Sequence, residues 1–518
     1  MSVSSKLRLF FFASIFIVIC LYTIVLSHKI NLVTADLGRH ITNGKYVFLD
    51  KNILNQNYYS YTNPEFKTLN HHWAAGVVYY LINNSFGIIG VQILSIVISL
   101  ITLAVFILSQ KRGPVYYLLI VPLLFLCLPI FSQRTEIRPE SFSYLFIAIF
   151  YFLLQKKRNN EISPKYLLLV PLLEVLWVNL HVYFFLGPVM VAVYLLESYL
   201  KKDKDTYLYL KLFTLTVLAT LINPHTIQGI LSPLSMFTNY GYELAENQSV
   251  IFMMTHYPRF SYYLFIFVFT ILAFSFLLVI LKNTKKFSIS GFLLGLIFSV
   301  MAWKMIRNLA IFSLISIPII IENFESIKDK IGNFVISVDG KVKKISLNNH
   351  VLSKIYFFAS VLILFYCLLT NQFRKLPYWG EFGLGLENGN SNAAQFFLDN
   401  NLKGPIYNNY DIGGYLIYYL FPREKVYVDN RPEAYPSSFF TDEYVPGQDN
   451  ESKWQELLKK YNFNVIFFSY KDITPWGIKF INNRINDKDW APVFLDKDIV
   501  ILLKRNIQYK QLIDQFEL

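Results

Sequence analysis

Long uninterrupted apolar runs are the feature that most restricts what this chain can fold into. They recur through the first 370 residues, and each reaches or approaches the roughly 20 residues that span a bilayer as a helix. Only 16% of the residues are charged, whereas a soluble domain carries about 25%. Backbone groups in lipid must hydrogen-bond within their own segment, so continuous runs predict membrane-spanning helices rather than a β-barrel.

Lysine and arginine indicate how these helices are oriented. They gather in short turns between the runs, at 111–112, 156–158, 201–204 and 282–286, which is the pattern of cytoplasmic loops. This threading predicts about eleven transmembrane helices, a cytoplasmic N-terminus and an extracytoplasmic C-terminal domain. Because the basic residues mark loops, the net charge of +13 does not indicate a nucleic-acid partner. We expect a multi-pass protein of the cell inner (plasma) membrane.

The last part of the chain has a different pattern. Short β-branched or aromatic runs alternate there with helical patterns, and residues 490–504 read as a closing hairpin, which predicts a small α/β domain. The predicted strands are 404–408, 425–429 and 464–469, and the predicted helices are 391–400, 454–461 and 475–486. We therefore expect a transmembrane domain over 1–370, with a large first outer loop at about 28–75, and a soluble extracytoplasmic domain over 371–518.

Polar and charged residues gather at the outer ends of the predicted helices. Carboxylates, guanidiniums, imidazoles and amides occur together there, whereas the inner turns carry mainly lysine. Any one of them could simply anchor a helix end at the interface, but the mixture as a set is typical of a binding site. A divalent cation is a further possibility, because Asp36 and His40 are four residues apart and could share a helix face, with His71 and His72 as added ligands.

Several strings resemble one family, in the order in which that family carries them. The strings are Asp36 to His40 with Gly44, Asn57 to Thr62, His71 to Trp73, Arg138 to Ser143, Trp177 to His181, Asn409 to Leu416 and Val426 to Arg431. Together they resemble the GT-C glycosyltransferases, and most of all a bacterial branch related to the protein mannosyltransferase and lipopolysaccharide-sugar transferase type. GT-C enzymes are membrane proteins that use polyprenyl-phosphate sugars as donors.

The resemblance implies an activity and a site. Asp36 matches the catalytic acid of the first outer loop, but Leu37 stands where many members have a second acid, which Glu136 or Glu140 would then supply. The implied reaction is inverting transfer of a hexose or pentose from a polyprenyl-phosphate donor to a glycan, lipid or protein acceptor on the extracytoplasmic face. Within this reading, the chemistry of the residues predicts Arg138, Arg307 and Arg39 as donor-phosphate ligands, and His40, His71, His72, Trp73, Glu140, Asn179 and His181 as substrate ligands.

Two other functions are alternatives to this one. A non-catalytic GT-C-like membrane scaffold or glycan-binding protein would explain the missing second acid after Asp36. A lipid-linked sugar transporter or flippase would need ionisable residues near the bilayer midplane and matching broken helices in two halves, which the sequence does not show.

Overall fold

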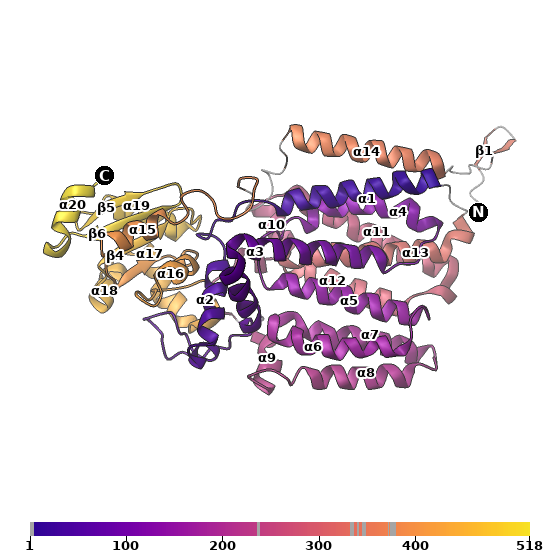
Figure 1. Cartoon of the computed structure of the whole chain (residues 1–518), viewed down its shortest axis with the longest axis horizontal. Helices are drawn as coiled ribbons and strands as arrows, with labels where there is room; N and C mark the ends of the chain where they lie inside the picture. The colour runs from indigo at the N-terminus through magenta and orange to yellow at the C-terminus, as the bar shows by residue number, and fades with distance from the viewer. Residues whose placement is uncertain are drawn as a thin grey trace.

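The computed structural model describes residues 5–235, 239–331, 336–338, 341–343, 349–370, 372 and 380–518. A bundle of roughly parallel helices forms one end of the molecule, and a mixed helix and strand domain forms the other (Figure 1). The predicted boundary between 370 and 371 falls at a stretch that is mostly outside the described residues.

The bundle contains a helix at every predicted span. Its long helices are α1 (Ser5–Leu26), α3 (Trp73–Leu108), α4 (Pro114–Phe131), α5 (Glu140–Arg158), α6 (Leu169–Leu180), α7 (Leu186–Leu200), α8 (Thr206–Ala219), α11 (Phe260–Asn283), α12 (Ile289–Lys304), α13 (Leu309–Ile331) and α14 (Asn349–Leu369). The 3₁₀ turns η2 (Pro164–Leu168) and η3 (Val182–Phe185) lead into α6 and α7.

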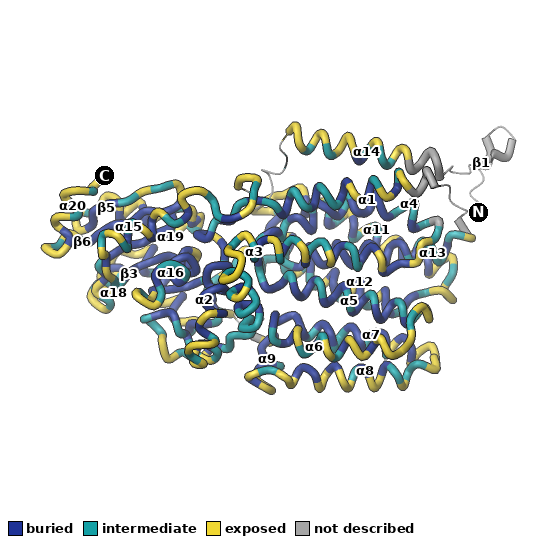
Figure 2. The backbone as a smooth tube through the Cα atoms, in the orientation of Figure 1, coloured by how far each residue is buried: buried dark blue, intermediate teal, exposed yellow. Residues whose placement is uncertain are grey.

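Five helices in the described part of the chain are long and apolar enough to cross a membrane: α1, α3, α7 with η3, α11 and α13 with η6 (Ile306–Asn308). Their outward faces expose large apolar side chains such as Phe274 and Leu281, as do α8 with Leu218 and α14 with Leu362. Figure 2 shows exposed positions along α8 and α14. Apolar side chains on the outside of a bundle are stable in lipid and costly in water. The chain is a multi-pass membrane protein.

Helix α3 begins earlier than the sequence predicts. The apolar run that predicts this span is residues 87–108, but the helix starts at Trp73, and Gly87 interrupts it with φ of 66°. That angle lies in the left-handed region that glycine adopts without strain. The first part of α3 therefore belongs structurally to the first outer loop, where it packs against α2 (Leu37–Val47).

Short elements lie in the turns between the long helices. They are η1 (Lys51–Leu54), α9 (Ile227–Ser235), η4 (Ala245–Asn247), α10 (Val250–His256), η5 (Thr284–Lys286) and the antiparallel pair β1 (Ile336–Val338) and β2 (Lys341–Lys343). Helices α3, α5 and α13 all have their N-terminal ends at the end of the bundle that faces the mixed domain, and the lysine-rich turns lie at the opposite end.

A four-stranded sheet organises the mixed domain. Its strand order is β3 (Ile406–Asn408), β4 (Val465–Ser469), β6 (Ile499–Lys504) and β5 (Trp490–Leu495), with β3 parallel to β4 and the other pairs antiparallel. Ile406 pairs with Val465, and Val465 pairs with Leu503 on its other side. The predicted hairpin at 490–504 is thereby confirmed.

Helices cover both faces of this sheet. They are α15 (Asn392–Asp399), α16 (Gly413–Leu420), α17 (Val445–Asp449), α18 (Glu451–Tyr461), α19 (Pro475–Ile485) and α20 (Lys510–Phe516), with the short turns η8 (Pro432–Ala434), η9 (Phe439–Tyr444) and η10 (Ile507–Tyr509). Every residue of β4 is buried, and its side chains alternate between two cores. Phe467 joins the large core that continues into the bundle, whereas Ile466 and Phe468 join a separate aromatic cluster.

The strand predicted at 425–429 is wrong. Apart from one bridge between Ser60 and Val426, this segment has no strand pairing in the described structure. Asn408 instead binds it through side-chain bonds, accepting from the Tyr427 backbone N–H at 2.9 Å and donating to the Val428 carbonyl at 2.7 Å. This segment lies beside the first outer loop rather than in the sheet. Residues 429–433 are therefore at the boundary between the mixed domain and the bundle.

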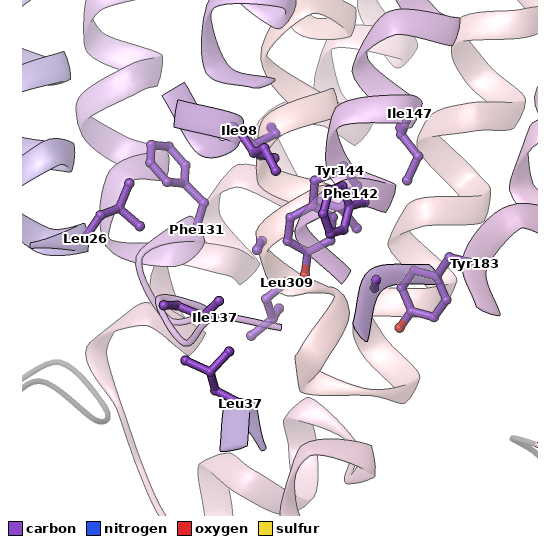
Figure 3. Packing of buried hydrophobic residues seen from close by; sticks show 14 of the residues in the cluster. Leu26, Leu37, Ile98, Phe131, Ile137, Phe142, Tyr144, Ile147, Tyr183 and Leu309 are labelled. Atoms are coloured by element: carbon purple, nitrogen blue, oxygen red, sulfur yellow. The ribbon is translucent and has the colours of Figure 1, made fainter. Parts of the chain in front are cut away.

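The apolar core fixes the segments that carry the predicted site. Figure 3 shows Leu37 and Ile137 in one cluster with Leu26, Phe131 and Leu309. Leu37 follows Asp36 and Ile137 precedes Arg138 in the sequence, so burial of these two side chains anchors the backbone next to each polar residue.

Candidate functional site

A polar cavity of about 130 Å³ lies where the end of the bundle meets the mixed domain. The turns before α5, α7 and α13 contribute to it, together with α2 and residues 430–433. It is lined by Asp36, Arg39, His40, His71, His72, Arg138, Pro139, Glu140, His181, Val182, Tyr240, Leu244, Glu246, Asn247, Arg307, Asn430, Pro432 and Glu433. Nine of the predicted site residues are among these, so the tertiary structure brings them to one place.

Two predicted substrate ligands lie outside the lining. The indole Nε1 of Trp73 donates to Asn179 Oδ1 at 3.1 Å. The Asn179 amide nitrogen donates to the carbonyls of Val175 and Ile222, each at 2.8 Å. These bonds fasten α3 to α6 and to the residues that follow α8, so both side chains have a structural role. Their contact with a substrate stays a prediction.

Asp36 presents its carboxylate to the cavity from the N-terminal end of α2. It is the N-cap residue, but its side chain makes no capping bond, and the helix dipole favours a negative charge at this position. The Asn430 amide donates to one carboxylate oxygen, and Arg138 Nη1 lies 3.6 Å from the other. Asn430 also accepts from Arg39 Nε at 2.8 Å, so one amide from the mixed domain orients two residues of the first outer loop.

Three arginines converge on a carboxylate that the sequence did not single out, Glu246 of η4. Its oxygens lie 2.7 Å from Arg138 Nη1, 2.9 Å from Arg134 Nη1 and 3.4 Å from Arg307 Nη1. Burial alone would raise the pKa of Glu246, but the guanidiniums of Arg138, Arg134 and Arg307 lower that pKa below its ordinary value. Glu246 is therefore ionised at neutral pH.

Each of these arginines also has a partner other than Glu246. Arg134 forms a bidentate pair with Glu140, at 2.6 and 2.7 Å, and Arg138 pairs with Glu136 at 2.8 Å. Arg307 Nε donates to the Tyr183 hydroxyl at 3.0 Å. Burial raises the pKa of Glu136 to about 7 even though Arg138 and Arg134 oppose the shift. The predicted substrate ligand Glu140 is thus occupied by Arg134, and the predicted phosphate ligand Arg39 is bound to Asn430 rather than to Glu246.

Four histidines line the cavity as a contiguous group. The His72 ring lies 4.2 Å from His71, 5.0 Å from His181 and 5.8 Å from His40, measured between ring centroids. Burial and neighbouring positive charges lower the pKa of His40 and of His72 well below the ordinary value, so both rings are neutral at pH 7. A neutral imidazole offers one donor and one acceptor, which suits sugar hydroxyls.

A hydrogen-bond chain indicates the tautomer of His181. Trp177 Nε1 donates to the Ser143 hydroxyl oxygen at 2.7 Å, and that hydroxyl lies 2.8 Å from His181 Nδ1. The Tyr183 backbone N–H also points to Nδ1, at 3.4 Å. Because Nδ1 accepts, the proton of a neutral ring resides on Nε2.

The geometry does not by itself build a metal site. Among the described residues, no group of three or more His, Cys, Asp and Glu side chains is placed to hold a metal ion. A cation that took some of its ligands from a substrate phosphate would not require such a group. The divalent cation therefore stays a prediction.

The residues that the sequence reasoning missed come from two places. Glu246 and Asn247 lie between α8 and α11, and Asn430 stands between Asp429 and Arg431 in the string from Val426 to Arg431. Arg431 forms a bidentate ion pair with Asp429, at 2.8 and 2.7 Å, and donates to Asn57 at 3.1 Å. The sequence offered one indication of Asn430, because the string from Val426 to Arg431 resembles the same family as the string from Asp36 to His40.

The fold and the site define a multi-pass membrane protein with an arginine-rich cavity at one end of its bundle. Over 97% of the chain it is similar to ArnT from Cupriavidus metallidurans bound to undecaprenyl phosphate, with 12% identity, 98% coverage of that chain and a TM-score of 0.48. Over 97% it is also similar to the arabinofuranosyltransferase AftD from Mycobacteria, with 12% identity and a TM-score of 0.46, but it spans only 40% of that chain. No protein-family model and no curated protein matches.

Proposed function

We propose that this protein is a GT-C membrane glycosyltransferase that transfers a sugar from a polyprenyl-phosphate donor to an acceptor hydroxyl. One observation carries the proposal: a carboxylate, Asp36, and the guanidiniums of Arg138 and Arg307 line the same cavity at the end of a membrane bundle. A base for the acceptor and cations for a phosphate are the two groups that this transfer needs. A cavity at that end can receive a lipid-linked donor from the bilayer.

The reaction follows from these groups. Asp36 takes the proton of the acceptor hydroxyl while that oxygen attacks the anomeric carbon of the sugar. The bond between this carbon and the phosphate oxygen breaks, and the electron pair leaves with the polyprenyl phosphate. The leaving phosphate gains negative charge, which Arg138 and Arg307 stabilise. Attack from the face opposite the leaving group inverts the anomeric carbon.

The histidines supply contacts to the sugar. His40, His71, His72 and His181 line the cavity beside Asp36, and the Nε2 proton of His181 can donate to a hydroxyl. Buried neutral polar groups that match hydroxyls discriminate against analogues that lack them. Glu140 and Glu136 act by holding Arg134 and Arg138.

The charge pattern supports the extracytoplasmic side of the inner membrane for the cavity. The turns at 156–158, 201–204 and 282–286 carry the lysines and lie at the bundle end away from the mixed domain. Lysine-rich turns remain in the cytoplasm. The cavity and the mixed domain would then face the opposite side, where the acceptor would be a glycan, lipid or protein.

Sugar transfer by the full chain in liposomes tests the proposal. The donors are undecaprenyl phosphates that carry radiolabelled hexoses or pentoses, tested with glycan, lipid and protein acceptors. We expect Asp36→Asn to lower the transfer rate by about 100-fold or more, because a general base contributes that much. The control is Asp50→Asn, since Asp50 lies in the same loop but caps η1, outside the cavity lining.

Two results would contradict the proposal. Equal transfer by the wild type and Asp36→Asn would remove Asp36 as the base. No transfer from any donor by the wild type, together with no binding of undecaprenyl phosphate, would favour a non-catalytic scaffold.

A further inference from the structure

Glu246 stands at the point where three guanidiniums meet. Arg134, Arg138 and Arg307 come from two separate turns, yet each directs one Nη1 at this carboxylate, at 2.9, 2.7 and 3.4 Å. Guanidiniums bind carboxylate and phosphate oxygens with the same forked geometry. The place that Glu246 fills is therefore also the best-matched place in the cavity for a phosphate.

The arginines are held more firmly than the carboxylate. Their side chains are 10–16% exposed, and Glu140, Glu136 and Tyr183 bind them from behind. The Glu246 side chain is 24% exposed, and among the described residues its hydrogen-bond partners are these three arginines. Of the four groups, Glu246 is the one that can leave without dismantling the cluster.

In the described structure, few hydrogen bonds hold the backbone around Glu246 to the bundle. It is a single 3₁₀ turn in which the Asn247 N–H bonds to the Leu244 carbonyl at 3.0 Å. Its ties to the bundle are the bond from Arg307 to Asn247 Oδ1, at 2.9 Å, and the bond from the Ile306 N–H to the Gln248 carbonyl, at 3.0 Å. None of the residues in this turn is buried. Tyr242 and Leu244, just before the turn, pack against the aromatic cluster of the mixed domain, so only residues 245–247 lack buried contacts. A turn of this kind opens at lower cost than a buried element.

We propose that Glu246 is an internal counter-ion that the donor phosphate displaces from the three arginines. This inference rests on the proposed function, because it names the phosphate subsite of that reaction. A sugar phosphodiester carries one negative charge, so its exchange for the carboxylate leaves the net charge beside the arginines unchanged. After transfer the lipid phosphate carries up to two charges, and the returning carboxylate competes with it and promotes its release. Glu246 thus sets donor affinity and product release.

Binding of undecaprenyl phosphate to the full chain tests the exchange. Removing the competing carboxylate with Glu246→Gln should tighten binding by about tenfold or more, since a ligand binds more weakly when its site is mostly occupied from within. The matched control is Glu243→Gln, because Glu243 lies three residues before Glu246 but is exposed and outside the cavity lining. We expect this control to change the affinity less than about threefold, because an exposed charge is screened by salt.

Hydrogen exchange of the wild type gives a second measurement that needs no variant. Undecaprenyl phosphate should increase exchange over residues 245–248, because the turn is released. Unchanged or weaker binding by Glu246→Gln, or unchanged or slower exchange over 245–248, would overturn the inference and leave the proposed function standing. Failure of both proteins to bind undecaprenyl phosphate would instead contradict the proposed function itself.

Discussion

Single side chains from distant parts of the chain complete the cavity. Asn430 is 394 positions from Asp36 in the sequence, yet its amide donates to the Asp36 carboxylate and accepts from Arg39. A carboxylate held by one directed bond keeps one orientation, and a base must be oriented toward the proton that it takes. Asn430 is thus a positioning residue for the proposed base.

Replacing Asn430 with alanine should slow transfer without weakening donor binding. We expect Asn430→Ala to lower kcat about tenfold, because the variant removes a hydrogen bond to a charged group worth about 1.5 kcal/mol. The donor KM should stay within about threefold. Steady-state rates over a donor series measure both constants.

Asn486→Ala is the matched control for Asn430→Ala. Asn486 lies in the same domain, and its amide donates only to the Asn482 carbonyl on the exposed side of α19. An unchanged kcat in Asn430→Ala would show that the amide does not position the base. An increase in KM alone would assign Asn430 to donor binding instead.

At the scale of elements, helix α2 contacts both the bundle and the mixed domain. It packs against the first part of α3 on one side and against α16 on the other. The contact with α3 requires glycine at position 44, because a Cβ there would lie 2.0 Å from the Gly76 carbonyl oxygen. The close approach of these two backbones sets the position of Asp36, Arg39 and His40 on α2.

Gly44→Ala should therefore disrupt both stability and activity. We expect a loss of about 1–3 kcal/mol, the usual cost of overpacking, and a lower thermal midpoint in detergent. Transfer activity should fall with it, because α2 must move away from α3.

Gly295→Ala in α12 provides the comparison for Gly44→Ala. A Cβ at Gly295 would meet its nearest atom, on Leu272, at an ordinary 3.5 Å. We expect its thermal midpoint to stay close to that of the wild type. Equal midpoints for the two variants would show that the α2 and α3 contact can relax around a methyl group.

At the scale of the whole molecule, the charged residues separate into two ends. The arginine and histidine cavity lies where the bundle meets the mixed domain, and the lysine-rich turns lie at the far end. Lipid separates the two ends because the helices between them are apolar. The orientation of the entire protein therefore follows from which end stays in the cytoplasm.

Labelling of single cysteines in intact cells tests this orientation. Ile507 is 96% exposed on the mixed domain, and Lys204 lies in a lysine-rich turn. A membrane-impermeant maleimide should label Ile507→Cys in intact cells and Lys204→Cys only after the membrane is opened, because the positive turns stay inside. The wild type measures any labelling of Cys20, Cys127 and Cys367. The opposite pattern would place the cavity in the cytoplasm.

The sequence by itself was sufficient for the helices of the bundle and for the turns that carry charge. Apolar run length predicts these helices because a backbone in lipid has no other way to satisfy its polar groups. The string before α5 was enough to single out Arg138, and the polar turn at 496–498 was enough to predict the hairpin at 490–504. Each of these patterns lies within one segment, so it can be recognised without knowing which segments pack together.

Only the tertiary structure decided which polar side chains meet. Glu246 and Asn430 carry no local pattern, because each becomes part of the site through contacts with turns far away in the chain. The same reason explains the misassigned strand at 425–429, whose extended backbone binds Asn408 and the first outer loop instead of the sheet. Trp73 and Asn179 come from two different family strings, and packing of α3 on α6 pairs them with each other outside the cavity lining. Ion pairs and amide bonds depend on which segments pack together, and packing is a property of the whole fold.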